Sequence, residues 1–147
     1  MTHVRRWMRL WILLMLFVSL TACGGTPVAF ADIPVHPDAA PLDAGGHPLA
    51  DTVGNTFREA VSQENVQVDM QMYTLPLDTD WEAIKAFYEE QIADDWKADD
   101  RLAQDTEAFK TIGWTRGGFV SEQGLAIGYG PPMLGNAPYL MVALFSQ

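Results

Sequence analysis

The chain contains one cysteine, Cys23, in its 147 residues. A single cysteine cannot form a disulfide within the chain. Any folded domain in this sequence must therefore be held together by its hydrophobic core rather than by covalent cross-links.

Positive charge is scarce beyond the first nine residues. Arg5, Arg6 and Arg9 are three of the nine basic residues, and all nineteen acidic residues lie after residue 22. Residues 23–147 therefore carry nineteen acidic and six basic side chains, a net charge of −13. This balance argues against nucleic-acid binding, which needs clustered Lys and Arg, and against a polybasic patch on anionic lipid. The high apolar content, 48%, argues against a disordered acidic tail.

The chain also lacks an apolar run long enough to favour a permanent transmembrane helix. A spanning helix needs about 20 consecutive apolar residues, whereas the run that starts at Leu10 already contains Ser19 and Thr21. A basic segment, a short apolar run and small residues before a cleavage point are typical of a secretory signal.

The cysteine follows this apolar run directly, in the sequence Leu20-Thr21-Ala22-Cys23. This stretch resembles the lipobox of bacterial lipoproteins. The resemblance implies that the Cys23 thiol receives a diacylglyceryl group and that signal peptidase II cuts before Cys23, which becomes the mature N-terminus. Two acyl chains anchor a protein stably where one does not. We therefore expect a domain tethered to the cell membrane through Cys23 and facing outside the cytoplasm.

Two other interpretations of this region stay open. An ordinary secretory signal would be cut after Ala29-Phe30-Ala31, which has the small-x-small form, although that site lies eleven positions beyond Leu20. Alternatively, Cys23 is a free or buried thiol in a cytosolic protein.

Apolar periodicity predicts helices and strands in residues 32–147. A helix of modest length is predicted over residues 53–61, and a clearer one over residues 81–92, opened by Asp78-Thr79-Asp80. Strict alternation over residues 66–73 predicts a half-buried strand. Further strands are predicted over residues 96–102, 109–114, 125–129 and 139–145, with turn signals at Gly117-Gly118 and Gln123-Gly124.

This order of elements predicts an α+β fold, with one main helix packed on a twisted, mostly antiparallel sheet. The predicted domain organisation has three parts: a lipoprotein signal peptide over 1–22, the lipidated cysteine and a tether over 23–31, and a single extracytoplasmic domain over 32–147. The continuously apolar segment 139–145 is expected at the centre of the sheet.

Several segments resemble a second family, of small and mostly uncharacterised bacterial exported domains. Its pattern combines an I/L-P-x-x-P-x-A entry, a strand ending in tyrosine and a helix with F-Y-x-x-x-L-x-x-x-G-W. The matching segments here are Ile33–Ala39, Tyr73-Thr74 and Phe87–Trp96, with Asp95 where the pattern prefers glycine. The resemblance implies an exported fold and assigns no catalytic residues.

No catalytic signature is visible, so we expect a protein that is not an enzyme and needs no cofactor. Phosphate-cradling glycine loops and nucleophile motifs are absent from the sequence. His36 and His47, near two aspartates in a proline-rich stretch, are interpreted as surface residues rather than metal ligands. The acidic residues of 94–107 are interpreted as a solvated face, and weak binding of a divalent cation there stays open.

One loop is the candidate contact site. It is formed by Tyr129, Pro131, Pro132, Met133 and Leu134. Prolines and apolar residues in a loop on a rigid scaffold are typical of a partner contact, although a strand connection tucked over the core has the same composition. We therefore predict an envelope or surface interaction module with an unidentified protein partner. The alternative is a lipoprotein that binds a small ligand or solute between helix and sheet, and an envelope hydrolase ranks last.

Overall fold

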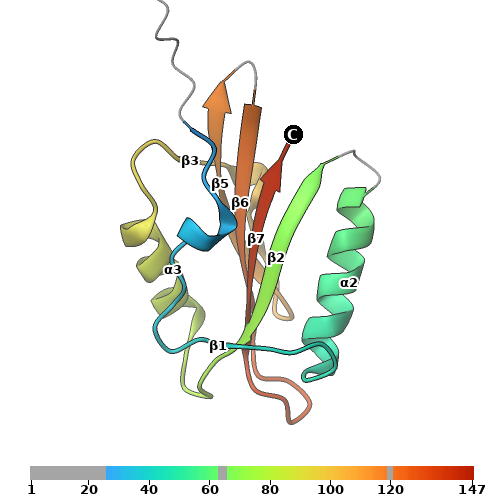
Figure 1. Cartoon of the computed structure of the whole chain (residues 1–147). Helices are drawn as coiled ribbons and strands as arrows, with labels where there is room; N and C mark the ends of the chain where they lie inside the picture. Colours follow the sequence, from blue (N-terminus) through green and yellow to red (C-terminus); the bar gives the residue numbers. More distant parts are fainter. Residues whose placement is uncertain (1–25, 63–65, 119–120) are drawn as a thin grey trace, which may run out of the picture.

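The computed structural model describes residues 26–62, 66–118 and 121–147 (Figure 1). The elements in chain order are η1 (Phe30–Asp32), β1 (Ala40–Pro41), α2 (Pro48–Ser62), β2 (Gln67–Thr74), α3 (Trp81–Gln91), β3 (Lys97–Ala98), η2 (Asp100–Leu102), β4 (Gln104–Asp105), β5 (Lys110–Gly118), β6 (Ser121–Gly130) and β7 (Tyr139–Ser146). The predicted signal peptide and Cys23 lie outside the described residues. Within the described residues, no helix is both long and apolar enough to cross a membrane.

One antiparallel sheet dominates the fold. Its strand order is β1-β2-β7-β6-β5-β3, and β4 also pairs with β5. Strand β7 lies between β2 and β6, and its side chains alternate between two core clusters on the two faces of the sheet, so residues 139–144 are all buried. The predictions of an alternating strand at β2 and of a central strand at β7 are both confirmed.

The two helices pack on opposite faces of the sheet, which corrects the prediction of one main helix (Figure 1). Helix α3 packs beside Leu140 and Val142, and α2 packs beside Met141 and Ala143. A strand that is apolar on both faces needs cover on both, and α3 alone can shield only one of them. Helix α2 is the longer of the two, and the fold is mixed α+β.

Helix α2 is hard to predict because Gly54 lies at its centre. Glycine lowers helix propensity by about 1 kcal/mol, but here it lets the helix lie close to β2. A Cβ at position 54 would be 3.4 Å from Met70 Cε and 3.9 Å from Met72 Cγ. The alternating apolar residues of β2 therefore face α2, not the helix that the sequence shows most clearly.

Small residues on β6 leave room for aromatic rings on the α2 side of the sheet. The register places Gly124, Ala126, Gly128 and Gly130 on the same side as Met141 of β7. Aromatic rings of neighbouring segments lie over these positions: a Cβ at Gly128 would be 2.5 Å from Phe109 Cζ, and one at Gly124 would be 3.1 Å from Phe145 Cδ2. The predicted turn at Gln123-Gly124 is therefore wrong, because both residues belong to β6.

The predicted strand over residues 96–102 is also largely wrong. Only Lys97–Ala98 pairs with β5, and the chain then turns through η2. The Asp99 carboxylate accepts hydrogen bonds from the Arg101 backbone N–H at 3.0 Å and from its guanidinium at 2.6 Å. Aspartate that bonds to the backbone two residues on favours a turn over a strand.

The first described residues form an N-terminal strap, residues 26–39, that crosses the α3 face of the sheet (Figure 1). Val28 exchanges two hydrogen bonds with the buried side-chain amide of Gln123, at 2.8 and 2.9 Å. Val28 and Phe30 pack against the core. Residues 28–30, part of the predicted tether over 23–31, are therefore docked on the sheet.

Candidate functional site

Three loops meet at one end of the sheet, at the bottom of Figure 1. The β6–β7 loop, residues 131–138, is bonded to both of the others. The Leu75 backbone N–H, in the β2–α3 loop, donates to Pro138 O at 3.0 Å. The His47 imidazole, in the β1–α2 loop, bonds to Ala137 O at 2.8 Å. The base of the β6–β7 loop is therefore held rigidly on two sides.

The protonation of His47 follows from its two partners. The Ala50 backbone N–H can only donate, and it points at Nδ1 from 3.2 Å, so Nδ1 must be unprotonated. Nε2 then carries the hydrogen and donates to the Ala137 carbonyl. His47 is the N-cap of α2, since its side chain accepts from the Ala50 backbone N–H in the first turn. With both ring nitrogens used and the side chain buried, His47 is neither a surface residue nor available as a metal ligand.

His36 is also buried, which corrects its expected place on the surface. Its ring packs edge-on against Phe87, with ring centroids 5.0 Å apart, and its Nδ1 accepts from the Asp38 backbone N–H at 3.3 Å. Beside it, burial raises the pKa of the Tyr88 phenol far above its ordinary value. The Tyr88 hydroxyl has no partner within hydrogen-bond distance and angle among the described residues, although the His36 backbone is near enough to lower the phenol pKa in part.

The β6–β7 loop ends in a tight turn formed by Met133–Asn136. The Asn136 backbone N–H donates to Met133 O at 2.9 Å, and the Asn136 side chain donates to the same oxygen at 3.2 Å. The two central residues have positive φ, 53° at Leu134 and 81° at Gly135. This is the signature of a type I′ turn, which favours Asn, Asp or Gly at its first central position. A leucine there costs about 1 to 2 kcal/mol in backbone conformation.

Burial does not offset this cost, because Leu134 is 88% exposed. Leu77, in the β2–α3 loop at the same end of the sheet, is 73% exposed, and Met133 is 41% exposed. We refer to Leu77, Met133 and Leu134 as the apolar tip. Exposed single apolar residues are ordinary, but these three project from two loops that the hydrogen bond from Leu75 N–H to Pro138 O joins.

The five residues of the predicted contact loop divide into two groups. Pro132, Met133 and Leu134 are exposed, and Pro131 is half-buried. Tyr129 belongs to the core: its ring stacks on Trp81 with centroids 6.0 Å apart, and its hydroxyl donates to Thr79 O at 2.9 Å. Tyr129 therefore ties β6 to the start of α3 and offers no surface to a partner. Leu77 completes the tip, and its place cannot be read from the sequence.

The charges at this end of the sheet are acidic. Asp78 follows Leu77 directly, Asp80 lies two residues further on, and Asp43 lies in the β1–α2 loop; all three are exposed. Lys110, at the start of β5, is paired with Asp105 at 2.7 Å. The apolar tip is thus bordered by carboxylates.

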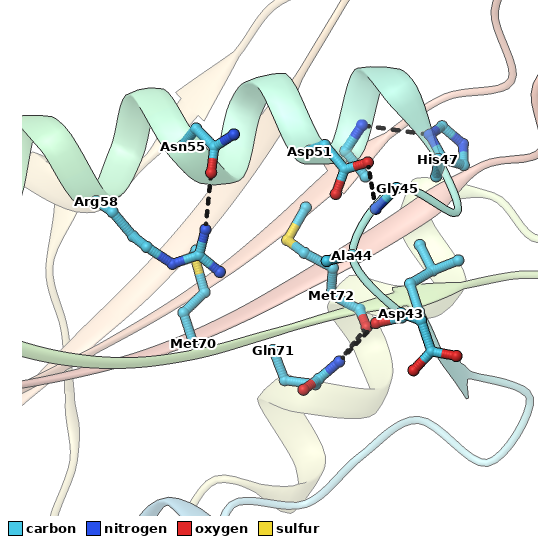
Figure 2. Close-up of a pocket in the computed structure, with 12 residues that line it drawn as sticks. Asp43, Ala44, Gly45, His47, Asp51, Asn55, Arg58, Met70, Gln71 and Met72 are labelled. Carbon is cyan, nitrogen blue, oxygen red and sulfur yellow. Dashed lines mark hydrogen bonds between the residues drawn. The ribbon is translucent and has the colours of Figure 1, made fainter.

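A second feature is the α2–β2 cleft, an opening of about 520 Å³ between helix α2, β2 and the loop before α2 (Figure 2). Its floor includes Met70 and Met72, and Arg58 Nη1 donates to Asn55 Oδ1 at 3.2 Å along the helix. The Asp51 carboxylate accepts from the Gly45 backbone N–H at 3.1 Å. The cleft thus combines one guanidinium, two carboxylates (Asp43 and the hydrogen-bonded Asp51) and two thioethers.

Three of the six acidic residues of 94–107 lie in separate ion pairs. Asp95 pairs with Arg116 at 2.5 Å, and Asp99 pairs with Arg101 at 2.6 Å. Within the described ranges, no group of three or more His, Cys, Asp or Glu side chains is arranged to hold a metal ion. The pKa of Asp99 is lowered by its hydrogen bonds from Arg101, which favour the charged carboxylate.

The predicted lipobox, Leu20 to Cys23, precedes the described residues, and the structure shows where the chain that follows it joins the domain. Thr26 lies where β5 meets β6, because the Arg116 guanidinium donates to Thr26 O at 3.2 Å. This is the end of the sheet opposite the apolar tip (Figure 1).

No protein-family model matches the chain, and no match is found among curated proteins or among solved structures. The two resemblances, to bacterial lipoproteins and to small exported domains, therefore stay predictions.

Proposed function

We propose that this chain is a lipid-anchored lipoprotein whose extracytoplasmic domain works as a protein-contact module rather than as an enzyme. One observation carries the proposal: Thr26, the first described residue after the predicted lipobox, and the apolar tip lie at opposite ends of the sheet. Thr26 lies beside Arg116 at one end, and Leu134 projects from the other.

The proposed anchor holds the domain close to the membrane. Two residues lie between Cys23 and Thr26, so the three Cα-to-Cα steps between them reach at most about 11 Å. Residues 28–30 are docked on the sheet and cannot extend this reach while the strap stays bound. A loosely tethered domain would tumble over the bilayer, whereas this one is restricted to orientations in which the β5–β6 end faces the lipid.

The sheet then sets how far the tip stands from the membrane. Strand β6 has 10 residues and runs from the anchored end toward the tip, a length of about 30 Å. The acidic domain is repelled by anionic lipid, which favours the same orientation. The tip is thereby presented to a partner in the space beyond the bilayer.

The proposal is tested by replacing the lipid acceptor in the full chain. Cys23→Ser should abolish labelling by a radioactive or clickable fatty acid and release the domain from the membrane fraction. Leu134→Asn is the matched control, because it changes the tip and should leave lipid labelling as in the wild type. Equal labelling and equal membrane retention of the Cys23→Ser and wild-type proteins would contradict the proposal.

A second candidate function is small-ligand binding in the α2–β2 cleft. The observation in its favour is the opening of about 520 Å³, within the size range of small-molecule sites. Amide NMR titration with succinate and with free amino acids tests it. Saturable shifts at Asn55 and Arg58, lost in Arg58→Gln and absent at exposed Glu90, would favour this function. Unchanged spectra would remove it.

A further inference from the structure

Resting on the proposed function, we propose that the partner is a protein with an apolar socket bordered by Lys and Arg. In this proposal Leu134 is the side chain that enters the socket, and Leu77 and Met133 pack around its mouth. The argument has three parts: the conformation of Leu134, the rigidity of its loop and the charge around it.

Folding does not explain a leucine at position 134. Its φ of 53° is a conformation that side-chain-bearing residues rarely adopt, and its side chain is almost fully exposed. Asparagine or glycine would form the same turn more easily. A strained and exposed leucine therefore contributes nothing to the domain itself, and strain of this kind is typical of positions kept for binding.

The loop that carries Leu134 is preorganised. Asn136 closes the turn with two hydrogen bonds to Met133 O. His47 and Leu75 hold the base of the loop through Ala137 and Pro138. A rigid tip loses little conformational entropy on docking, so less of the binding free energy of the leucine contact is lost to ordering the loop.

The charges select the kind of partner. Asp78, Asp80 and Asp43 border the tip, and Lys110 at the same end is already paired with Asp105. A partner surface with Lys or Arg around an apolar socket complements this arrangement, and like charge repels acidic surfaces.

Other occupants fit less well. A membrane would meet the acidic border unfavourably, and the proposed anchor places the bilayer at the other end of the sheet. A second copy of the chain would present the same acidic border and a net charge of −13 beyond residue 22. A small molecule would leave the Leu134 side chain, which is 88% exposed, largely in water, whereas a protein socket can enclose it.

Site-specific photo-cross-linking in cells expressing the full chain tests this proposal. The photoreactive amino acid p-benzoylphenylalanine is placed at position 77, once in the wild-type background and once with Leu134→Asn. Glu59, exposed on the outer side of α2, carries the same probe as the matched control. We expect one discrete cross-linked protein from position 77, none from position 59, and a yield about tenfold lower with Leu134→Asn. We also expect the yield to fall when salt is raised from about 50 to about 500 mM, since salt screens exposed charges.

Each other outcome overturns the proposal in a different way. Cross-links to lipid would assign the tip to a membrane, and cross-links to the same chain would assign it to a dimer. A yield unaffected by Leu134→Asn, or by salt, would show that Leu134 or the acidic border does not direct the contact. Fatty-acid labelling of the same samples reports the lipidation of Cys23 separately. Failure of the lipid anchor and failure of tip docking are therefore distinguishable.

Discussion

The side-chain amide of Gln123 pairs with the backbone of Val28 as a neighbouring strand would. Its oxygen accepts from Val28 N–H at 2.8 Å, and its nitrogen donates to Val28 O at 2.9 Å. Gln123 is 6% exposed, so these bonds form away from water. One side chain of β6 thus fixes where the N-terminal strap joins the domain, and with it the reach of any anchor at Cys23.

Gln123→Ala should release the start of the strap. Two buried hydrogen bonds at about 1 kcal/mol each predict a loss of about 2 kcal/mol in the free energy of unfolding. Urea unfolding measures this loss, and limited proteolysis should show new cleavage near residues 26–32. Gln104→Ala is the control, because Gln104 is exposed on β4 and should change neither readout. An unchanged unfolding midpoint in Gln123→Ala would contradict this account of the strap.

Leu134→Asn should stabilise the domain. The substitution relieves the positive-φ strain and removes an exposed leucine, so we expect the free energy of unfolding to rise by about 1 kcal/mol. Leu77→Asn is the matched control, because Leu77 is also exposed but has no positive φ, and it should bring no such gain. Thermal and urea unfolding of both variants make the comparison. A loss of stability in Leu134→Asn would mean that the leucine does support the fold.

Tyr88 and Tyr129 form a matched pair that measures how an unpaired and a hydrogen-bonded buried hydroxyl affect the free energy of unfolding. Tyr88 OH has no hydrogen-bond partner among the described residues, whereas Tyr129 OH donates to Thr79 O. Tyr88→Phe should therefore stabilise the domain by about 1 kcal/mol, and Tyr129→Phe should destabilise it by about the same amount. Urea unfolding measures both changes. Equal effects of the two substitutions would contradict the assignment of Tyr88 as unpaired.

The buried tyrosines predict a loss of stability in alkali. Burial raises the pKa of Tyr73, Tyr88, Tyr129 and Tyr139, because it disfavours the charged phenolate. Below about pH 10 the phenols stay protonated in both states, so their contribution to stability is fully present. Above that pH the unfolded chain loses protons that the folded chain keeps, so the free energy of unfolding falls as pH rises.

Urea midpoints and near-ultraviolet phenolate absorbance, measured from about pH 8 to pH 11, check this prediction. We expect constant midpoints up to about pH 9.5, then a decline, with most phenolate absorbance appearing only on unfolding. Tyr88→Phe should reduce the decline, because it removes the most strongly shifted of the four groups. Midpoints that stay constant over the whole range would contradict the prediction.

The elements that can be predicted from the sequence are those whose apolar pattern follows directly from their burial. The alternation in β2, the continuous run in β7 and the stripe of α3, capped by Asp80 at 2.8 Å from Ala83 N, are of this kind. The length of helix α2 is underestimated from the sequence. Its buried face includes the small residue Gly54, and this face is recognisable only once β2 is known to lie close to it. The glycines of β6 suggest turns, because their large neighbours, Phe109 and Phe145, come from other segments of the chain.

The candidate site is only partly predictable for the same reason. The sequence places Pro132, Met133 and Leu134 in one loop, but does not reveal the positive φ of Leu134. It cannot bring Leu77 to the same end of the sheet, because that depends on the pairing of β2 with β7. Tyr129 is grouped with the loop because it is adjacent in sequence, whereas the alternation of β6 turns it into the core.

The measurement that tests the central claim most directly is the intact mass of the full-length gene product extracted from membranes, with its N-terminal peptide identified by mass spectrometry. The account predicts a chain that begins at Cys23 and carries the added mass of a diacylglyceryl group on the thiol. A chain that begins at Asp32, or one that retains residues 1–22 with an unmodified Cys23, would contradict it.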